Sequence, residues 1–218
     1  MRTPDLEKVL PAVEKIAADW RSPLSGTGRV KTRDPFRILV SCILSLRTKD
    51  AVTKTASERL LQIASTPEDI ARMEPTFIEQ LIYPVGFYRR KAVTLVAIAR
   101  LLLSSFNGVV PDSIDGLLQL PGVGRKTANI VITEGFAKPG IAVDTHVHRI
   151  TNRWGYVNTN TPEKTEIALR QKLPRVYWMD FNRLLVAFGQ KICRPISPLC
   201  TCCPVRCFCE RRGVTRSR

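Results

Sequence analysis

A lysine and an aspartate eighteen residues apart are the side chains of this sequence best suited to covalent chemistry. Lys126 follows a glycine-rich turn at the start of an expected helix, next to Arg125. The positive end of the helix dipole and the neighbouring guanidinium both disfavour an ammonium there, which helps the amine to act as a nucleophile. The more ordinary role of such a lysine is to hold a phosphate or to reach into water. Asp144 precedes another helical pattern, where it can cap the helix, act as the charged partner of the lysine, or do both.

Cysteines form the second group that could do chemistry. Six of the seven fall within seventeen residues near the C-terminus, whereas Cys42 stands alone in an apolar stretch. In a reducing compartment such crowding favours metal binding over disulfides. Cys42 is expected to be a small buried apolar residue.

The elements that must position Lys126 are two helices joined by a tight turn. Apolar residues at helical spacing flank the segment from Leu120 to Ala128 on both sides. Its glycines allow positive φ and close approach of a partner, and the amides of the second helix's first turn point outward. A DNA phosphate fits such a turn, although an ordinary helical corner would also use glycines to bend. The candidate DNA-binding residues here are Gly122, Val123, Gly124 and Arg125.

The remaining elements are predicted to be helices as well. Most segments carry apolar residues at a helical period, and polar caps followed by proline predict where helices start. The only short β-branched stretch, residues 140–143, runs directly into polar residues and fits an extended loop equally well. We therefore expect an all-α protein. Start signals lie at Asp34-Pro35, Thr66-Pro67 and Thr161-Pro162, and a stop signal lies at Asn107-Gly108 after the run from 88 to 106.

The charge of the chain points to a polyanionic partner. Its 218 residues include 34 Lys and Arg against 19 Asp and Glu, a net charge of +15. Nucleic acid is the natural interpretation, and a merely basic, soluble protein is the alternative. Because no apolar run approaches the roughly 20 residues of a membrane span, and the N-terminus lacks the apolar core of a signal peptide, we expect an intracellular protein without membrane contact that is not secreted.

In the glycine-rich turn, at Lys126 and at Asp144, the chain resembles the endonuclease III family of DNA glycosylases, within the helix-hairpin-helix superfamily. The hairpin from Leu120 to Ala128 reads much as in that family, with Lys126 at the catalytic lysine and Asp144 at the catalytic aspartate. The segments 86–88 and 109–111 also match. The resemblance covers roughly residues 5 to 210.

The resemblance also implies a cofactor. The spacing of Cys193, Cys200, Cys203 and Cys209 is the one that binds a 4Fe-4S cluster in the family. Residue types alone leave a tetrahedral zinc ion equally possible, because both groups take four thiolates. The resemblance favours the iron-sulfur cluster. Cys202 and Cys207 are then surplus, either as free thiols or as replacements for a neighbouring ligand.

The fold implied by the resemblance has two all-helical domains. A six-helix barrel with the hairpin is expected from residue 28 to 138, and residues 1–27 and 139–218 together are expected to form a helical iron-sulfur cluster domain. Lys126 and Asp144 would then face one groove, which suits bent duplex DNA. We expect a monomer.

The implied function is base-excision DNA repair by a bifunctional enzyme. It would act as a DNA N-glycosylase on damaged bases, with oxidised pyrimidines the expected class, and cleave the abasic site by β-elimination through a lysine imine. Its partner would be double-stranded DNA that contains a damaged base or an abasic site. The location would be intracellular, in the cytoplasm or nucleoid if the source is prokaryotic. One alternative is a mismatch-specific uracil or thymine glycosylase, although such enzymes lack the equivalent of Lys126. The other is a non-catalytic helix-hairpin-helix protein, which would not need Lys126 and Asp144 together.

Two further residues are expected, by resemblance, on the loops that enter the duplex. Phe87 would be the apolar wedge that fills the gap left by the flipped base, unless it is a core residue. Arg47, where the family commonly has glutamine, would contact the widowed base or, alternatively, a phosphate. The two histidines, His146 and His148, are expected to be structural or phosphate-contacting groups rather than catalysts.

Overall fold

The computed structural model describes residues 4–18 and 34–218, and all regular secondary structure in these residues is helical. The predicted all-α class is therefore confirmed. The chain divides into two compact units. We call Arg21–Gly140 the hairpin unit, and Met1–Trp20 with Ile141–Arg218 the C-terminal unit. The sequence prediction placed one boundary after residue 27, which lies outside the described residues, and the other after residue 138.

The predicted helix starts are confirmed, and each has a local cause. Asp34 Oδ1 accepts hydrogen bonds from the amides of Phe36 (2.9 Å) and Arg37 (3.2 Å). Thr66 forms a capping box with Asp69, and Thr161 accepts from a backbone amide in the same way. Because each cap satisfies amides that the helix itself leaves unpaired, the chain begins a helix at these positions.

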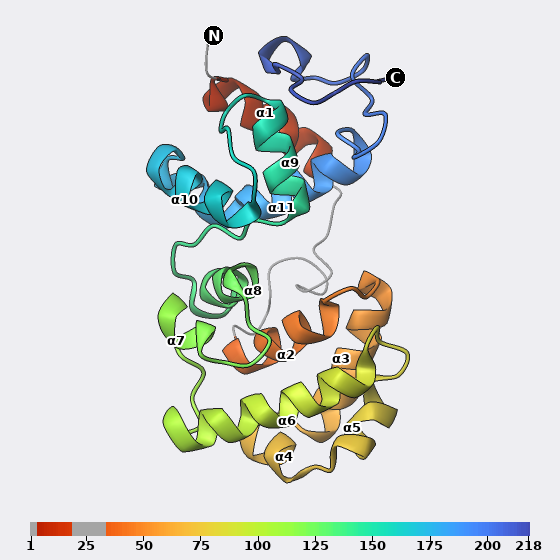
Figure 1. Ribbon diagram of the computed structural model, residues 1–218, viewed down its shortest axis with the longest axis vertical. Coiled ribbons are helices and arrows are strands. Elements are labelled where there is room, and N and C mark those ends of the chain that lie inside the picture. The colour runs from red at the N-terminus through yellow and green to blue at the C-terminus, as the bar shows by residue number, and fades with distance from the viewer. Residues whose placement is uncertain (1–3, 19–33) are drawn as a thin grey trace. The chain divides into compact units, whose positions relative to one another are not determined.

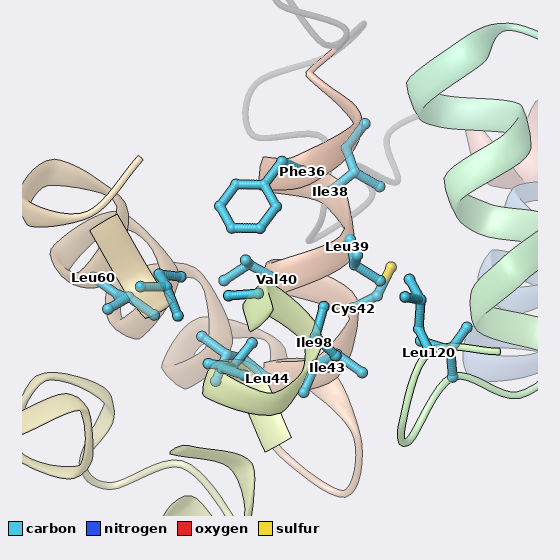
Figure 2. Packing of buried hydrophobic residues seen from close by; sticks show 14 of the residues in the cluster. Phe36, Ile38, Leu39, Val40, Cys42, Ile43, Leu44, Leu60, Ile98 and Leu120 are labelled. Carbon is cyan, nitrogen blue, oxygen red and sulfur yellow. The ribbon is translucent and has the colours of Figure 1, made fainter. Parts of the chain in front are cut away.

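The hairpin unit is built around one apolar helix, α2. Figure 2 shows side chains of α2, among them Leu39 and Leu44, between Leu60 on one side and Leu120 on the other. The same core takes in Ile98, so it joins helices that are far apart in the sequence. The helices of this unit are α2 (Pro35–Ser45), α3 (Asp50–Ile63), α4 (Pro67–Arg72), α5 (Pro75–Ile82), α6 (Tyr88–Ser105), α7 (Ile114–Leu118), α8 (Arg125–Ile130) and the π-helical turn η1 (Val131–Gly135).

The C-terminal unit brings the two ends of the chain together. Its first helix, drawn in red in Figure 1, packs among helices that follow residue 141. Trp154, Phe181 and Phe188 fill the centre of its core. None of the helices in the described part of the chain combines the length and apolar character needed to cross a membrane. The helices of this unit are α1 (Leu6–Ala17), α9 (Thr145–Arg153), α10 (Pro162–Lys172), the 3-10 turn η2 (Arg175–Tyr177), α11 (Trp178–Lys191) and the 3-10 turn η3 (Arg206–Phe208).

Candidate active site

The hairpin joins α7 to α8 through a turn that one glycine makes possible. Gly122 has φ +76°, in the left-handed region, and a Cβ there would lie 3.2 Å from Thr94 Cγ2. Gly124 caps α8 with an extended backbone, so only one of the two glycines has the positive φ expected from the sequence. A Cβ at Gly124 would meet nothing within 4 Å. The turn therefore depends on Gly122, and the surface beside Gly124 is open.

Lys126 is exposed in the first turn of α8. Arg125 beside it is half-buried, and the side chain of Val123 is buried at 7% exposure. Val123 therefore anchors the turn to the core of the hairpin unit. Its amide donates to Leu120 O at 3.1 Å, so Val123 shapes the turn and does not offer a side chain to DNA.

Cys42 is buried in the core of the same unit. Burial raises the pKa of the Cys42 thiol to about 12, and the charges of Lys126 and Glu134 act on the thiol in opposite directions. Cys42 is thus a buried neutral thiol, as the sequence predicts. Glu134 lies on the π-helical turn η1, which the sequence analysis did not foresee.

Asp144 caps α9, as one of its predicted roles requires. Its Oδ1 accepts hydrogen bonds from the amides of His146 (2.8 Å) and Val147 (2.9 Å). The carboxylate is half-buried, and these two bonds fix its position at the start of the helix. Lys126 belongs to the hairpin unit and Asp144 to the C-terminal unit.

The two histidines take part in hydrogen bonds within the C-terminal unit. His148 Nδ1 lies 2.6 Å from Thr165 Oγ1 on α10. His146 Nδ1 lies 3.1 Å from Arg149 Nη2 on the same helix. Such contacts are those of structural side chains, as expected from the sequence.

Arg47 and Phe87, forty residues apart in the sequence, lie side by side. The Arg47 guanidinium carbon is 5.8 Å from the centre of the Phe87 ring, within the range of a cation-π contact. Phe87 is 61% exposed, which excludes the alternative of a core residue. Both residues have positive φ, +53° for Arg47 and +59° for Phe87.

The cysteines predicted as ligands gather in one place. One pocket of the C-terminal unit is lined by all four, together with apolar side chains such as Trp154 and Leu199. Cys202 and Cys207 are exposed and do not line this pocket. Burial raises the pKa of Cys203 to about 11 and also raises the pKa of Cys209. In the described part of the chain, no three His, Cys, Asp or Glu side chains are arranged as ligands around an ion. The four lining cysteines are Cys193, Cys200, Cys203 and Cys209.

Hydrogen bonds to these sulfurs suit a metal-thiolate site. Arg153 Nη1 donates to Cys193 Sγ at 3.4 Å, and the Arg211 amide donates to Cys209 Sγ at 3.4 Å. Donors of this kind stabilise thiolate ligands and tune iron-sulfur clusters. These two donors would stabilise Cys193 and Cys209 as thiolates.

These features together indicate a class of protein. A glycine turn between two helices, a lysine just after it and an all-helical fold are those of a helix-hairpin-helix DNA repair protein. Residues 40–175 match the family model described as HhH-GPD superfamily base excision DNA repair protein. The chain therefore belongs to this superfamily.

The relatives define the family more closely. The chain is 50% identical to Endonuclease III of Thermotoga maritima over 186 residues, which cover 84% of this chain and 87% of the relative. It is 41% identical to Endonuclease III homolog 1, chloroplastic, of Arabidopsis thaliana, over 93% of this chain and 58% of that longer protein. The structure of a trapped endonuclease III-DNA covalent intermediate, an estranged-adenine complex, matches with a TM-score of 0.84 and 33% identity over 94% of both chains. Within the superfamily, the chain belongs to the endonuclease III family.

Membership of this family settles the kind of enzyme. The chain is a base-excision DNA repair enzyme with DNA glycosylase and abasic-site lyase activity. The alternative of a non-catalytic helix-hairpin-helix protein is therefore wrong. The resemblance found from the hairpin and the cysteines is confirmed at the level of family and fold.

Sequence reasoning missed one buried lysine. Lys91 lies on the apolar face of α6, in line with Leu95 and Leu102, at 6% exposure. A lysine at the helical period of a buried face is a usable signal, because an ammonium is rarely buried without hydrogen-bond acceptors. Its partners could not be foreseen, since they lie more than forty residues away.

Proposed function

We propose that this enzyme excises oxidised pyrimidines from duplex DNA through Lys126 and then cuts the strand with the same residue. The observation that carries this proposal is the exposed Lys126 at the start of α8, directly after the hairpin turn. A DNA substrate would place the protein inside the cell, and we expect it to act as a monomer.

Binding would begin at the hairpin. The turn would present the Gly124 amide and the Arg125 guanidinium to a phosphate, whereas the Val123 amide is bonded to Leu120 O. The open space beside Gly124 allows close approach. The net charge of +15 adds general attraction to the duplex. The damaged nucleotide must leave the stack before its sugar can meet an amine, at a cost of a few kcal/mol.

Excision is a substitution at the sugar. The Lys126 nitrogen bonds to C1′ while the bond from C1′ to the base breaks, and the base leaves with that electron pair. The nitrogen then loses a proton, the sugar ring opens at O4′, which gains a proton, and an imine forms between Lys126 and C1′.

The imine makes strand cleavage possible. Loss of a proton from C2′ allows the bond between C3′ and its oxygen to break, so the 3′ phosphate departs with those electrons. Water then hydrolyses the imine and returns Lys126 as a free amine. One residue thus serves both steps.

Asp144 would supply the negative charge that both steps use. Its position is fixed by the two amides that it caps, so the carboxylate needs no rearrangement during the reaction. We assign it two tasks, to stabilise the positive charge that develops on the sugar and to help deprotonate Lys126.

Arg47 and Phe87 would fill the gap in the duplex. The exposed Phe87 ring suits a wedge between base pairs. Arg47, held over that ring, suits a hydrogen bond to the base opposite the lesion, with guanine the favoured partner of an arginine.

We assign a 4Fe-4S cluster to the four cysteines that line one pocket of the C-terminal unit. Their shared pocket, and the exposure of Cys202 and Cys207 outside it, support this choice of ligands. When bound, the cluster would cross-link the segment after α11 through four thiolates. The ligands are Cys193, Cys200, Cys203 and Cys209.

Borohydride trapping tests the proposal directly. The protein is incubated with duplexes that carry thymine glycol, dihydrouracil, uracil or thymine mismatches, or an abasic site. We expect excision of the two oxidised or reduced pyrimidines and a trapped covalent complex that Lys126→Ala abolishes. Lys54→Ala, at an exposed lysine of α3, controls for loss of one positive charge. Trapping of Lys126→Ala at the wild-type rate would contradict the proposal, and excision of mismatched uracil or thymine alone would favour the mismatch-specific alternative.

A further inference from the structure

Arg47 and Phe87 both stand in a backbone conformation that needs support. A left-handed φ in a residue other than glycine is strained and persists only where the surroundings enforce it. The two residues lie on different loops, between α2 and α3 and between α5 and α6. Something in the hairpin unit must therefore hold both loops.

Lys91 makes three hydrogen bonds to the end of α2 and to the loop that follows it. Its Nζ lies 2.8 Å from Leu44 O, 2.5 Å from Leu46 O and 3.1 Å from Thr48 Oγ1. An ammonium has three donors, so each donor has an acceptor on the segment that ends α2 and surrounds Arg47. The buried charge thus holds the backbone that precedes Arg47 and the side chain of the residue that follows it.

Thr48 extends this network to the second loop. Its hydroxyl accepts from the Gly86 amide at 3.1 Å, next to Phe87 in the chain. The backbones of the two loops also touch, because a Cβ on Gly86 would lie only 2.6 Å from Arg47 O. One lysine and one hydroxyl therefore join the loop of Arg47 to the loop of Phe87.

The chemistry of Lys91 argues against a merely space-filling role. Burying an ammonium is costly, and an apolar side chain of similar length, such as methionine, would fill the same space without that cost. What methionine cannot supply is the set of three donors. The lysine at position 91 is thus explained by the loop backbone that it holds.

We propose that Lys91 is a positioning residue for recognition of the base opposite the lesion. Through Thr48 it holds the loops of Arg47 and Phe87 as one preformed unit, so that Arg47 meets the duplex in a fixed conformation. This inference rests on the proposed role of Arg47. Preorganised contacts bind better and discriminate better, because no ordering cost is due on binding.

The test compares variants that break the network with one that keeps it. Thr48→Val removes the hydroxyl at nearly constant volume, Thr48→Ser keeps it, and Lys91→Met removes the three donors. For each protein, single-turnover excision of one lesion is measured opposite guanine and opposite adenine. The ratio of the two rates should fall roughly threefold or more in Thr48→Val and Lys91→Met, because a displaced contact loses part of its effect. Thr48→Ser should keep the wild-type ratio.

A double variant shows whether the effect passes through Arg47. Arg47→Gln alone should change the ratio by roughly tenfold, as for loss of a bidentate contact to guanine. Adding Thr48→Val to Arg47→Gln should then change the ratio little further, since the network has lost the side chain that it positions. A full additional loss in the double variant would overturn the inference, as would an equal fall on both substrates in Thr48→Val alone.

Trypsin supplies a measurement that does not depend on DNA. The enzyme cuts after arginine, and Arg47 is exposed on the loop in question. Native Thr48→Val and Lys91→Met should be cut after Arg47 faster than wild type and Thr48→Ser. If Arg47→Gln keeps the wild-type base preference, the proposed role of Arg47 fails, and the cutting rate alone decides whether Lys91 holds the loop. The inference would be overturned if Thr48→Val and Lys91→Met both kept the wild-type preference for the base opposite the lesion and the wild-type rate of cutting after Arg47. If Lys91→Met does not fold, Thr48→Val alone decides.

Discussion

Replacing Asp144 by asparagine separates its charge from its role as a helix cap. Asparagine is as good an N-cap as aspartate, so Asp144→Asn should keep the hydrogen bonds that Oδ1 now accepts from His146 and Val147. The remaining loss is the attraction of the carboxylate to the helix dipole, about 0.3–1 kcal/mol. The melting temperature should therefore change by no more than roughly 4 °C, at the 2–4 °C per kcal/mol typical of chains of this length.

The catalytic effect of Asp144→Asn should be far larger than the effect on stability. A preorganised charge that stabilises a transition state contributes about 2.7 kcal/mol or more, so excision should slow on the order of 100-fold or more. Single-turnover excision of thymine glycol measures this rate, and binding of the same duplex to the unreacted enzyme should remain close to wild type.

Two other substitutions make this test sharper. Asp144→Ser keeps a capping oxygen without a charge and should resemble Asp144→Asn in both stability and rate. Asp144→Ala removes the cap and should cost a further ~1 kcal/mol in the free energy of unfolding. A folded, fully active Asp144→Asn protein would refute the catalytic assignment. If Asp144→Asn failed to fold, the carboxylate charge rather than the capping oxygen would be essential to the stability of α9.

Three further predictions follow from the same structure. The purified protein should be brown, and metal analysis should find about four irons. The irons should be lost in Cys200→Ser and kept in Cys202→Ser and Cys207→Ser, and one zinc with no iron would contradict this. Binding to undamaged duplex should weaken with salt, and the logarithm of the binding constant should fall with the logarithm of the salt concentration with a slope near −0.9 per phosphate neutralised. A flat plot would leave the net charge of +15 without a role. Burial lowers the pKa of Lys91 from 10.5 to about 8, so between these values the unfolded chain binds more protons than the folded one. The free energy of unfolding of wild type should therefore rise relative to that of Lys91→Met as pH increases from 8 to 10. Denaturant titration measures both free energies, and the same pH dependence in the two proteins would contradict the lowered pKa.

The features that the sequence predicts well are those with local causes. Asp34 and Asp144 bond to amides two or three residues ahead, so a polar residue before an apolar helical pattern is enough to place a helix start. The all-α class follows from the same local periodicity. The positive φ of Gly122 belongs to a turn readable in the same way, although Gly124 shows that not every glycine of such a turn needs it.

The contacts that the sequence could not predict join distant segments. Lys91 bonds to Leu44, Leu46 and Thr48, and no pattern within α6 names those partners. Arg47 and Phe87 were brought to attention by a family likeness, not by periodicity, and their contact depends on how two loops pack. The spacing of apolar and polar residues predicts contacts between residues that are close in the sequence. Contacts between distant segments depend on the path of the whole chain.

The way in which α1 joins the C-terminal unit has a consequence for synthesis of the protein. Lys191 Nζ donates to Ile16 O at 2.8 Å, a contact between residues 175 positions apart. Because translation proceeds from the N-terminus, α1 leaves the ribosome long before α11 exists to cover its apolar face. The hairpin unit has no such delay, since its described helices all lie between Pro35 and Gly135. During synthesis, therefore, the hairpin unit can fold first. Until α11 emerges, Val9, Leu10 and Val13 of α1 remain exposed to solvent and can bind chaperones or aggregate.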